Sequence, residues 1–87
     1  MKTKKILIKN PQGIHLRSAA TIVQAARKYK SRIVLAYKCK SADSCSILDL
    51  LALAAREGAE ISIVAQGPDE TEAIKGIEEL FVDGAGI

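Results

Sequence analysis

Hydrophobic positions along the chain follow two periods, and the changes of period divide it into seven predicted elements. Apolar residues at every second position, or a tight reversal after such a segment, predict four strands: residues 3–9, 32–38, 39–43 and 60–66. Steps of three and four residues, or a run of strong helix formers, predict three helices: residues 16 to about 29, 46–55, and 69 to the tail at 83–86.

Turn-forming and capping residues separate these segments. The Asn-Pro-Gln-Gly run at residues 10–13 ends the first strand, and Gly67-Pro68 ends the last. Gly58 is expected to stop the second helix as a C-terminal glycine. Asp69 and Glu72 have the spacing of a capping box at the start of the third helix. The boundaries therefore predict the order βαββαβα.

This order indicates the fold class and the number of domains. Strands and helices that are each apolar on one side predict an α+β open-faced sandwich, in which a four-stranded antiparallel sheet carries three helices on one face. The other face of the sheet would meet water. A chain of 87 residues buries too little surface for two independent cores, so residues 1–87 are expected to form a single domain.

Composition restricts the class of protein. The chain is 48% hydrophobic and 26% charged, and no apolar run reaches the roughly 18 residues that a membrane-spanning helix needs. The N-terminal apolar stretch, Ile6 to Ile8, is too short for a signal peptide. Cys39 and Cys45 lack the spacing of a zinc or redox motif and fit a reducing compartment. We expect a cytoplasmic protein without membrane insertion.

Charge is distributed unevenly along the chain. Residues 1–40 hold eleven Lys or Arg and no acid, whereas residues 57–87 hold eight acids and one lysine. Aromatic residues make up 3% of the chain, and no groove-reading motif is visible, so a nucleic-acid partner is not expected. The basic half is interpreted as a docking surface for an acidic protein, although lysines that only keep a small domain soluble explain it equally well.

His15 is the candidate for chemistry. It is the only histidine, and it stands between the glycine of a turn and the start of a helix. A neutral imidazole can attack phosphorus without a separate base, and the N–H groups and dipole of a helix start stabilise the anion that results. Arg17, two residues on, can place a guanidinium against phosphoryl oxygens. We predict that His15 carries a phosphoryl group.

Other interpretations of His15 remain open at this point. A lone histidine before a helix can simply cap it or lie on the surface. A metal site is disfavoured, because there is one histidine and neither cysteine is near it in sequence. A cysteine hydrolase with Cys39 or Cys45 as nucleophile has no visible motif or orienting partner.

Over essentially the whole chain the residues resemble the HPr phosphocarriers of the bacterial phosphoenolpyruvate-dependent sugar phosphotransferase system. The matching segments are residues 13–17 (Gly-Ile-His-Leu-Arg), Ala19-Ala20, residues 46–48 (Ser-Ile-Leu), Gly58, and residues 67–70 (Gly-Pro-Asp-Glu). The resemblance implies that His15 is phosphorylated at Nδ1 by an Enzyme I-type donor and passes the group to a sugar-specific Enzyme IIA-type acceptor. Arg17 would be the supporting cation. It implies a monomeric carrier without cofactor, metal or autonomous turnover.

Three positions depart from the family pattern. Leu16 stands where alanine is usual, Ser18 where proline is usual, and Cys45 where lysine is frequent. Serine can cap a helix as proline can begin one, so Ser18 should preserve the helix start. Leu16 enlarges the apolar contact beside His15, which leaves open a specialised relative with regulatory or nitrogen-related partners.

Residues 46–48 carry two further predictions. Ser46 is expected to cap the second helix, and by resemblance it is also a candidate for phosphorylation by a dedicated serine kinase. Ile47 and Leu48 diverge by about 100° around a helix axis, so one of them should be exposed. With Leu16 and Ala20 they would form an apolar partner-binding patch around His15. A non-catalytic regulatory module switched at Ser46 is the competing function.

Overall fold

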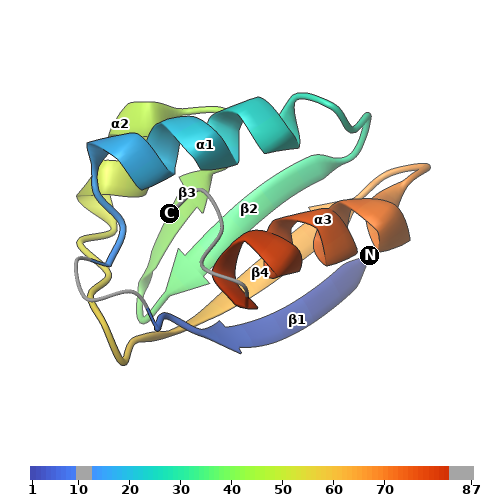
Figure 1. The fold of residues 1–87 in the computed structure, drawn as a ribbon. Helices are drawn as coiled ribbons and strands as arrows, with labels where there is room; N and C mark the ends of the chain where they lie inside the picture. The colour runs from blue at the N-terminus through green and yellow to red at the C-terminus, as the bar shows by residue number, and fades with distance from the viewer. Residues whose placement is uncertain (10–12, 83–87) are drawn as a thin grey trace.

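The computed structural model describes residues 1–9 and 13–82, and its elements follow the predicted order. The elements are β1 (Lys2–Leu7), α1 (Leu16–Ala26), β2 (Arg32–Tyr37), β3 (Lys40–Asp43), α2 (Ile47–Ala52), β4 (Glu60–Gln66) and α3 (Glu70–Val82). Figure 1 shows the strands forming one sheet, whose order is β1-β4-β2-β3. The predicted α+β class with the order βαββαβα is confirmed.

Every strand pairing in this sheet is antiparallel, and its register separates an inner from an outer face. Ile6 lies opposite Ile61, and Leu35 lies opposite both Ile63 and Ala42. All five are buried, because alternate residues of each strand point to the same side of a sheet. The predicted two-residue alternation therefore places one continuous apolar layer beneath the helices.

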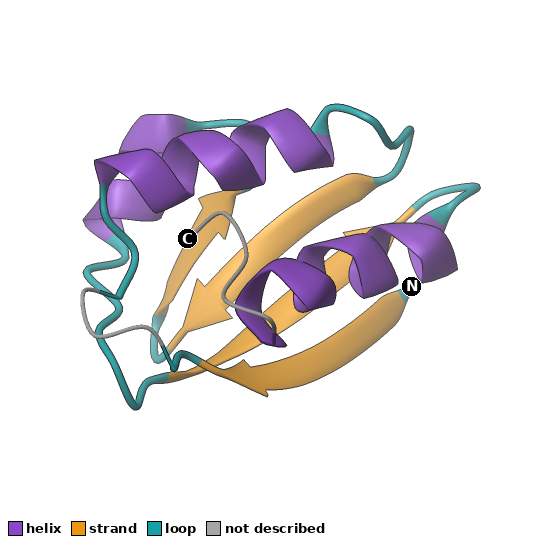
Figure 2. Cartoon of the chain, viewed as in Figure 1, coloured by secondary structure: helices purple, strands orange, loops and turns teal. Residues whose placement is uncertain are grey.

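The helices complete the core on that inner face. In Figure 2, α1 and α3 cross the same face of the sheet, and α2 contacts both α1 and β3. Ala19, Ile22 and Val23 of α1 are buried, as are Ala73 and Ile77 of α3. These residues recur at three- and four-residue steps, which is the spacing that brings side chains to one side of a helix. None of the helices in the described ranges is long and apolar enough to cross a membrane.

Two helix ends differ from the sequence prediction. Helix α1 ends at Ala26 rather than near Tyr29, because the N–H groups of Lys28 and Tyr29 bond to carbonyls three residues back and tighten the chain into a turn. Helix α2 ends at Ala52, and Ala54 rather than Gly58 takes the left-handed conformation after it. Gly58 has a φ of +88° in the turn that leads into β4. The predicted tail at 83–86 and the turn residues 10–12 lie outside the described residues.

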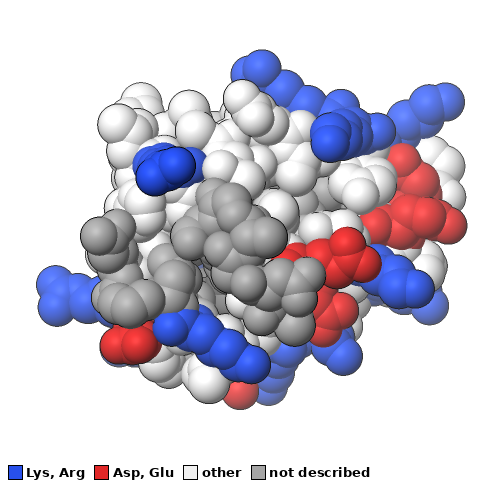
Figure 3. Space-filling model, viewed as in Figure 1, with Lys and Arg blue, Asp and Glu red and all other residues white. Residues whose placement is uncertain are grey.

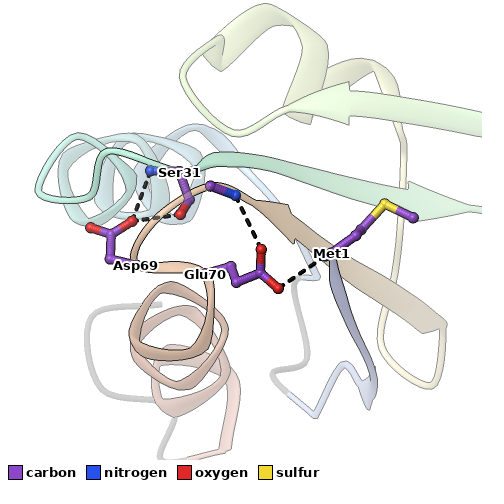
Figure 4. A network of polar contacts seen from close by, with 5 residues as sticks. Met1, Ser31, Asp69 and Glu70 are labelled. Carbon is purple, nitrogen blue, oxygen red and sulfur yellow. Dashed lines mark hydrogen bonds and ion pairs between the residues drawn. The ribbon is translucent and has the colours of Figure 1, made fainter.

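Asp69 connects two distant parts of the chain, as Figure 4 shows. Its carboxylate accepts the backbone N–H groups of Lys30 and Ser31, at 2.9 and 2.8 Å, and the Ser31 hydroxyl at 2.5 Å. These hydrogen bonds, the Ser31 hydroxyl first, lower the pKa of Asp69. The predicted capping box of Asp69 with Glu72 is therefore wrong, because Asp69 uses its carboxylate to tie the loop before β2 to the start of α3.

Glu70 makes the local contact at the start of α3 in its place. Its carboxylate accepts the backbone N–H of Gly67 at 3.2 Å and pairs with the N-terminal ammonium of Met1 at 3.0 Å. The bond from that ammonium, followed by the bond from Gly67, lowers the pKa of Glu70. The start of α3 is thus held to the end of β4 and to the beginning of β1 (Figure 4).

Candidate functional site

His15 begins helix α1 as its N-cap residue. Its backbone is extended, with φ −128° and ψ −178°, and its side chain is half-buried. The backbone N–H of His15 donates to the Ser18 hydroxyl at 2.8 Å, and that hydroxyl donates to the His15 carbonyl at 3.0 Å. Ser18 is completely buried. Ser18 therefore preserves the helix start, as predicted, but it does so from the third position of the helix, because the cap residue is His15.

The two residues before His15 are fixed by a different part of the chain. The backbone N–H of Ile14 donates to the Ala55 carbonyl at 3.0 Å, and the Ile14 side chain belongs to the core. Gly13 has a φ of +65°, and a Cβ atom there would lie within 2.7 Å of the Cα of Arg56. Only glycine allows this close approach. His15 is therefore positioned from both sides, by the loop after α2 and by its own helix.

The first turn of α1 offers backbone donors to an anion. The first hydrogen bond between backbone groups of the helix runs from the Ala19 N–H to the His15 carbonyl at 2.8 Å, and the N–H groups of residues 16 and 17 have no acceptor within the helix. The first turn holds no acidic residue that would offset the positive end of the helix dipole. A doubly charged group attached to His15 would meet favourable electrostatics there.

Arg17 adds a cation beside this helix start. It is exposed, and it takes part in neither of the ion pairs formed within the described residues, which use Glu70 and Glu78. The backbone carbonyl of Arg17 accepts the Thr21 hydroxyl at 3.1 Å, and this bond does not involve the guanidinium. The guanidinium can therefore turn toward an anion on His15 without losing a partner.

Ser46 caps α2, as predicted. Its hydroxyl accepts the backbone N–H of Asp49 at 3.2 Å. The Asp49 carboxylate accepts the backbone N–H of Asp43 at 3.3 Å, and the Asp43 carboxylate accepts that of Cys45 at 2.9 Å. The turn between β3 and α2 is held by these short-range bonds, with the serine hydroxyl at its edge.

Exposed leucines mark the surface around these two helix starts. Leu16 is 64% exposed and Leu48 is 78% exposed, whereas Ile47 packs against the core, so the prediction that one of the pair Ile47 and Leu48 faces water is confirmed. Ala20 is half-buried. Figure 1 shows α2 beside the N-terminal half of α1, and the two helices are in contact.

Charged side chains are unevenly distributed over the face of the molecule that Figure 3 shows. In Figure 3 the region over the start of α1 and over α2, at the upper left, shows uncharged atoms and a basic side chain, whereas acidic side chains gather over α3. The acids of the C-terminal half are thus kept away from the visible surface at the start of α1.

His15 is the N-cap residue of α1, as one alternative proposed, and the metal and cysteine alternatives can be compared with the described residues. Among residues 1–9 and 13–82, no three metal-ligating side chains come together. Cys39 and Cys45 are free and exposed, and no hydrogen bond between described residues joins either of them to His15. Sequence reasoning missed Ala55, whose carbonyl holds Ile14; a backbone contact from a loop about 40 residues away has no signal in the sequence.

Comparisons with known proteins agree on one family. Residues 2–83 match the family model described as the phosphorylation site of the phosphotransferase system HPr component. The chain is 41% identical over 81 residues to the phosphocarrier protein HPr of Treponema pallidum (strain Nichols), covering 93% of this chain and 92% of that protein.

Solved structures show the same likeness in three dimensions. The crystal structure of HPr-C-His from Thermoanaerobacter tengcongensis matches with a TM-score of 0.94 and 37% identity, over 100% of this chain and 98% of that one. The histidine-containing phosphocarrier protein of Mycoplasma matches with a TM-score of 0.90 and 31% identity, over 99% of this chain and 98% of that one.

Proposed function

This chain belongs to the HPr family of the phosphotransferase system, and on that premise we propose that it is a phosphocarrier whose His15 accepts and passes on a phosphoryl group. The phosphoryl donor is an Enzyme I-type protein that has been phosphorylated by phosphoenolpyruvate, and the acceptor is a sugar-specific Enzyme IIA-type protein. The position of His15 at the start of α1, fixed on both sides, is the observation that carries the proposal.

The transfer is a substitution at phosphorus. A ring nitrogen of neutral His15, Nδ1 by the family resemblance, forms a bond to phosphorus while the bond between phosphorus and the donor breaks. The electron pair of the broken bond leaves with the donor. In the second step the acceptor's nucleophile attacks the same phosphorus, and the electron pair of the P–N bond returns to His15. The carrier is regenerated unchanged, and it catalyses no reaction without its two partner proteins.

The chain's own contribution is to hold the transferred group. Backbone N–H groups of the first turn, and the Arg17 guanidinium, which forms no ion pair within the described residues, would donate hydrogen bonds to the phosphoryl oxygens. They stabilise the charge without reacting. In-line geometry must come from the docked partner, because phosphoryl transfer depends mainly on positioning and charge stabilisation.

Phosphorylation by phosphoenolpyruvate and a purified Enzyme I tests this proposal. Because His15 is the only histidine in the chain, any phosphohistidine formed is assignable to one residue. We expect an acid-labile label on the protein and its complete loss in His15→Ala. A label that persists in that variant contradicts the proposal.

Arg17 can be tested separately with a matched control. Arg17→Ala should slow phosphorylation by about tenfold, the loss expected for one charge-assisted contact. Arg27→Ala removes the same exposed side chain just after the other end of α1 and should leave the rate unchanged. Equal rates for the two variants would remove Arg17 from the proposed site.

We propose that partners dock on the apolar patch formed by Leu16, Ala20, Ile47 and Leu48. Small apolar patches bordered by cations suit brief contacts between proteins. The patch would have to stay free for two successive partners, which is consistent with a cytoplasmic monomer. Light scattering of the purified protein tests the monomeric state. Leu48→Ser, a change at a residue that is 78% exposed, should weaken transfer without lowering the melting temperature.

The proposal has a regulatory alternative centred on Ser46. Its hydroxyl accepts a hydrogen bond and donates none within the described residues, so a serine kinase could modify it. Ser46→Asp and Ser46→Asn both keep an N-cap acceptor, and only the former adds negative charge. If Ser46 regulates transfer, the Asp variant is phosphorylated at His15 more slowly than the Asn variant. A His15→Ala variant that still regulates a target would instead favour an HPr-like interaction module, or a nitrogen-related relative with other partners.

A further inference from the structure

A cleft lies between the turn that joins β2 to β3 and the loop that joins α2 to β4. Its volume is about 720 Å³, which lies within the range of small-molecule sites. It is lined by residues 37–40 on one side and by residues 53–54 and 56–59 on the other. In Figure 1 these two segments lie at the lower left, where β2 and β3 meet the yellow loop. His15, Arg17 and Ser46 take no part in it.

The cleft combines an apolar floor with a basic rim. Leu53 is buried, and Tyr37 and Ala59 are half-buried beside it. The rim carries three exposed cations, Lys38, Lys40 and Arg56, and one carboxylate, Glu57. None of the three cations forms an ion pair with another described residue. Exposed cations that border an apolar hollow and form no ion pair are suited to an anionic ligand with an apolar body.

The backbone on both walls is held in an unfavourable conformation. Lys38 has a φ of +55° and Ala54 a φ of +54°, and they are the two non-glycine residues with positive φ in the described part of the chain. Glycine would adopt both conformations without strain. Strained residues of this kind gather at functional sites, because the surrounding structure must be arranged to hold them. Here they define the two facing walls of one cleft.

The Tyr37 side chain in the cleft favours a ligand that contains a ring. The Lys38 ammonium lies 5.3 Å from the centre of the Tyr37 ring, so the cation and the aromatic face are presented together. A ligand ring packed against Tyr37 and Leu53 would place a phosphate substituent among the rim cations. A phosphate offers three oxygens to the ammonium and guanidinium donors.

We propose that this cleft binds a small phosphomonoester with a ring body. The ring lies on Tyr37 and Leu53, and the phosphate contacts Lys38, Lys40 and Arg56. Binding involves no covalent step and does not require His15. The proposal therefore stands or falls independently of the phosphocarrier function.

Titration with phenyl phosphate, followed in ¹H–¹⁵N NMR spectra, tests the site. We expect saturable shifts of backbone amides in residues 37–40 and 53–59. Arg56→Ala and Lys38→Ala should each weaken binding by about fivefold to tenfold. Lys5→Ala removes another exposed lysine, from β1 and outside the cleft. It should bind as the wild type does, as should His15→Ala.

The two cysteines give a second measurement. Cys39 lines the cleft and Cys45 does not, and both are exposed. In a Cys45→Ser variant, phenyl phosphate should slow alkylation of Cys39 by iodoacetamide. In a Cys39→Ser variant the same ligand should leave Cys45 alkylation unchanged. Protection of both thiols would indicate a general effect of the anion and would contradict the site.

Three results overturn the proposal. The first is the absence of saturable shifts in residues 37–40 and 53–59 at phenyl phosphate up to about 20 mM, which excludes even weak binding. The second is an affinity for inorganic phosphate equal to that for phenyl phosphate, which removes the role of the ring. The third is equal weakening by Lys5→Ala and Arg56→Ala, which indicates attraction to overall positive charge.

Discussion

The end of helix α2 offers the sharpest test of how this chain is held, because an alanine occupies a position suited to glycine. Ala54 has a φ of +54° and an exposed side chain, so Ala54→Gly removes strain without removing a buried contact. An L-residue in the left-handed region destabilises the fold by about 1–2 kcal/mol, which glycine would relieve. The greater freedom of glycine in the unfolded chain offsets about 0.4–1 kcal/mol of that gain. The free energy of unfolding should therefore rise by about 1 kcal/mol, or about 5 °C in melting temperature.

Thermal unfolding followed by circular dichroism at neutral pH measures this change, and Ala52→Gly supplies the control. Ala52 is also exposed but lies within α2, where glycine should lower stability by about 1 kcal/mol. The same substitution two residues apart is thus expected to have opposite signs. If Ala54→Gly lowers the melting temperature as Ala52→Gly does, the strain assigned to Ala54 does not exist.

Three further predictions concern the approach to His15 and the network at α3. Gly13→Ala should lower the free energy of unfolding by about 2–4 kcal/mol in urea titrations, because its Cβ would strike backbone atoms, whereas Gly58→Ala, with open space around it, should cost only about 1 kcal/mol. Ser18→Ala should cost about 1–2 kcal/mol and slow phosphorylation of His15, and an unchanged rate would show that this hydroxyl does not position the histidine. Asp69→Asn should lower the melting temperature above pH ~5. The difference in melting temperature from wild type should disappear as the pH falls through the lowered pKa of Asp69, because a carboxyl group with a lowered pKa stabilises the fold only while it is ionised. A difference that stays constant down to pH ~2 would refute this.

The site illustrates how much of a function can be predicted from neighbouring residues. The hydrogen bonds that fix His15 and that cap α2 join residues three positions apart along the chain: His15 with Ser18, and Ser46 with Asp49. Helix starts have sequence preferences because a cap satisfies donors that lie in the same turn. The position of His15 and the cap at Ser46 were therefore predictable, whereas the docking patch and the partners are still proposals.

Contacts between distant segments were not predictable. Asp69 was assigned to its own helix because that spacing is common, yet its carboxylate is bonded to Lys30 and Ser31. The sequence does not state that the loop before β2 will lie beside the start of α3. That neighbourhood exists because β2 and β4 are adjacent in the sheet. A carboxylate there gains more bonds across the molecule than along its helix.

The end of α2 shows the same division within a few residues. Composition and the N-cap at Ser46 determined that a short helix forms, and Gly58 was the natural stop signal. The structure turns instead at Ala54, because Leu53 and Ala55 on either side are buried and the Ala55 carbonyl holds Ile14. Local preferences determine which elements form and where His15 lies in its helix. Tertiary packing decides which conformational strain is tolerated, because buried neighbours on both sides outweigh the preference of a single exposed residue.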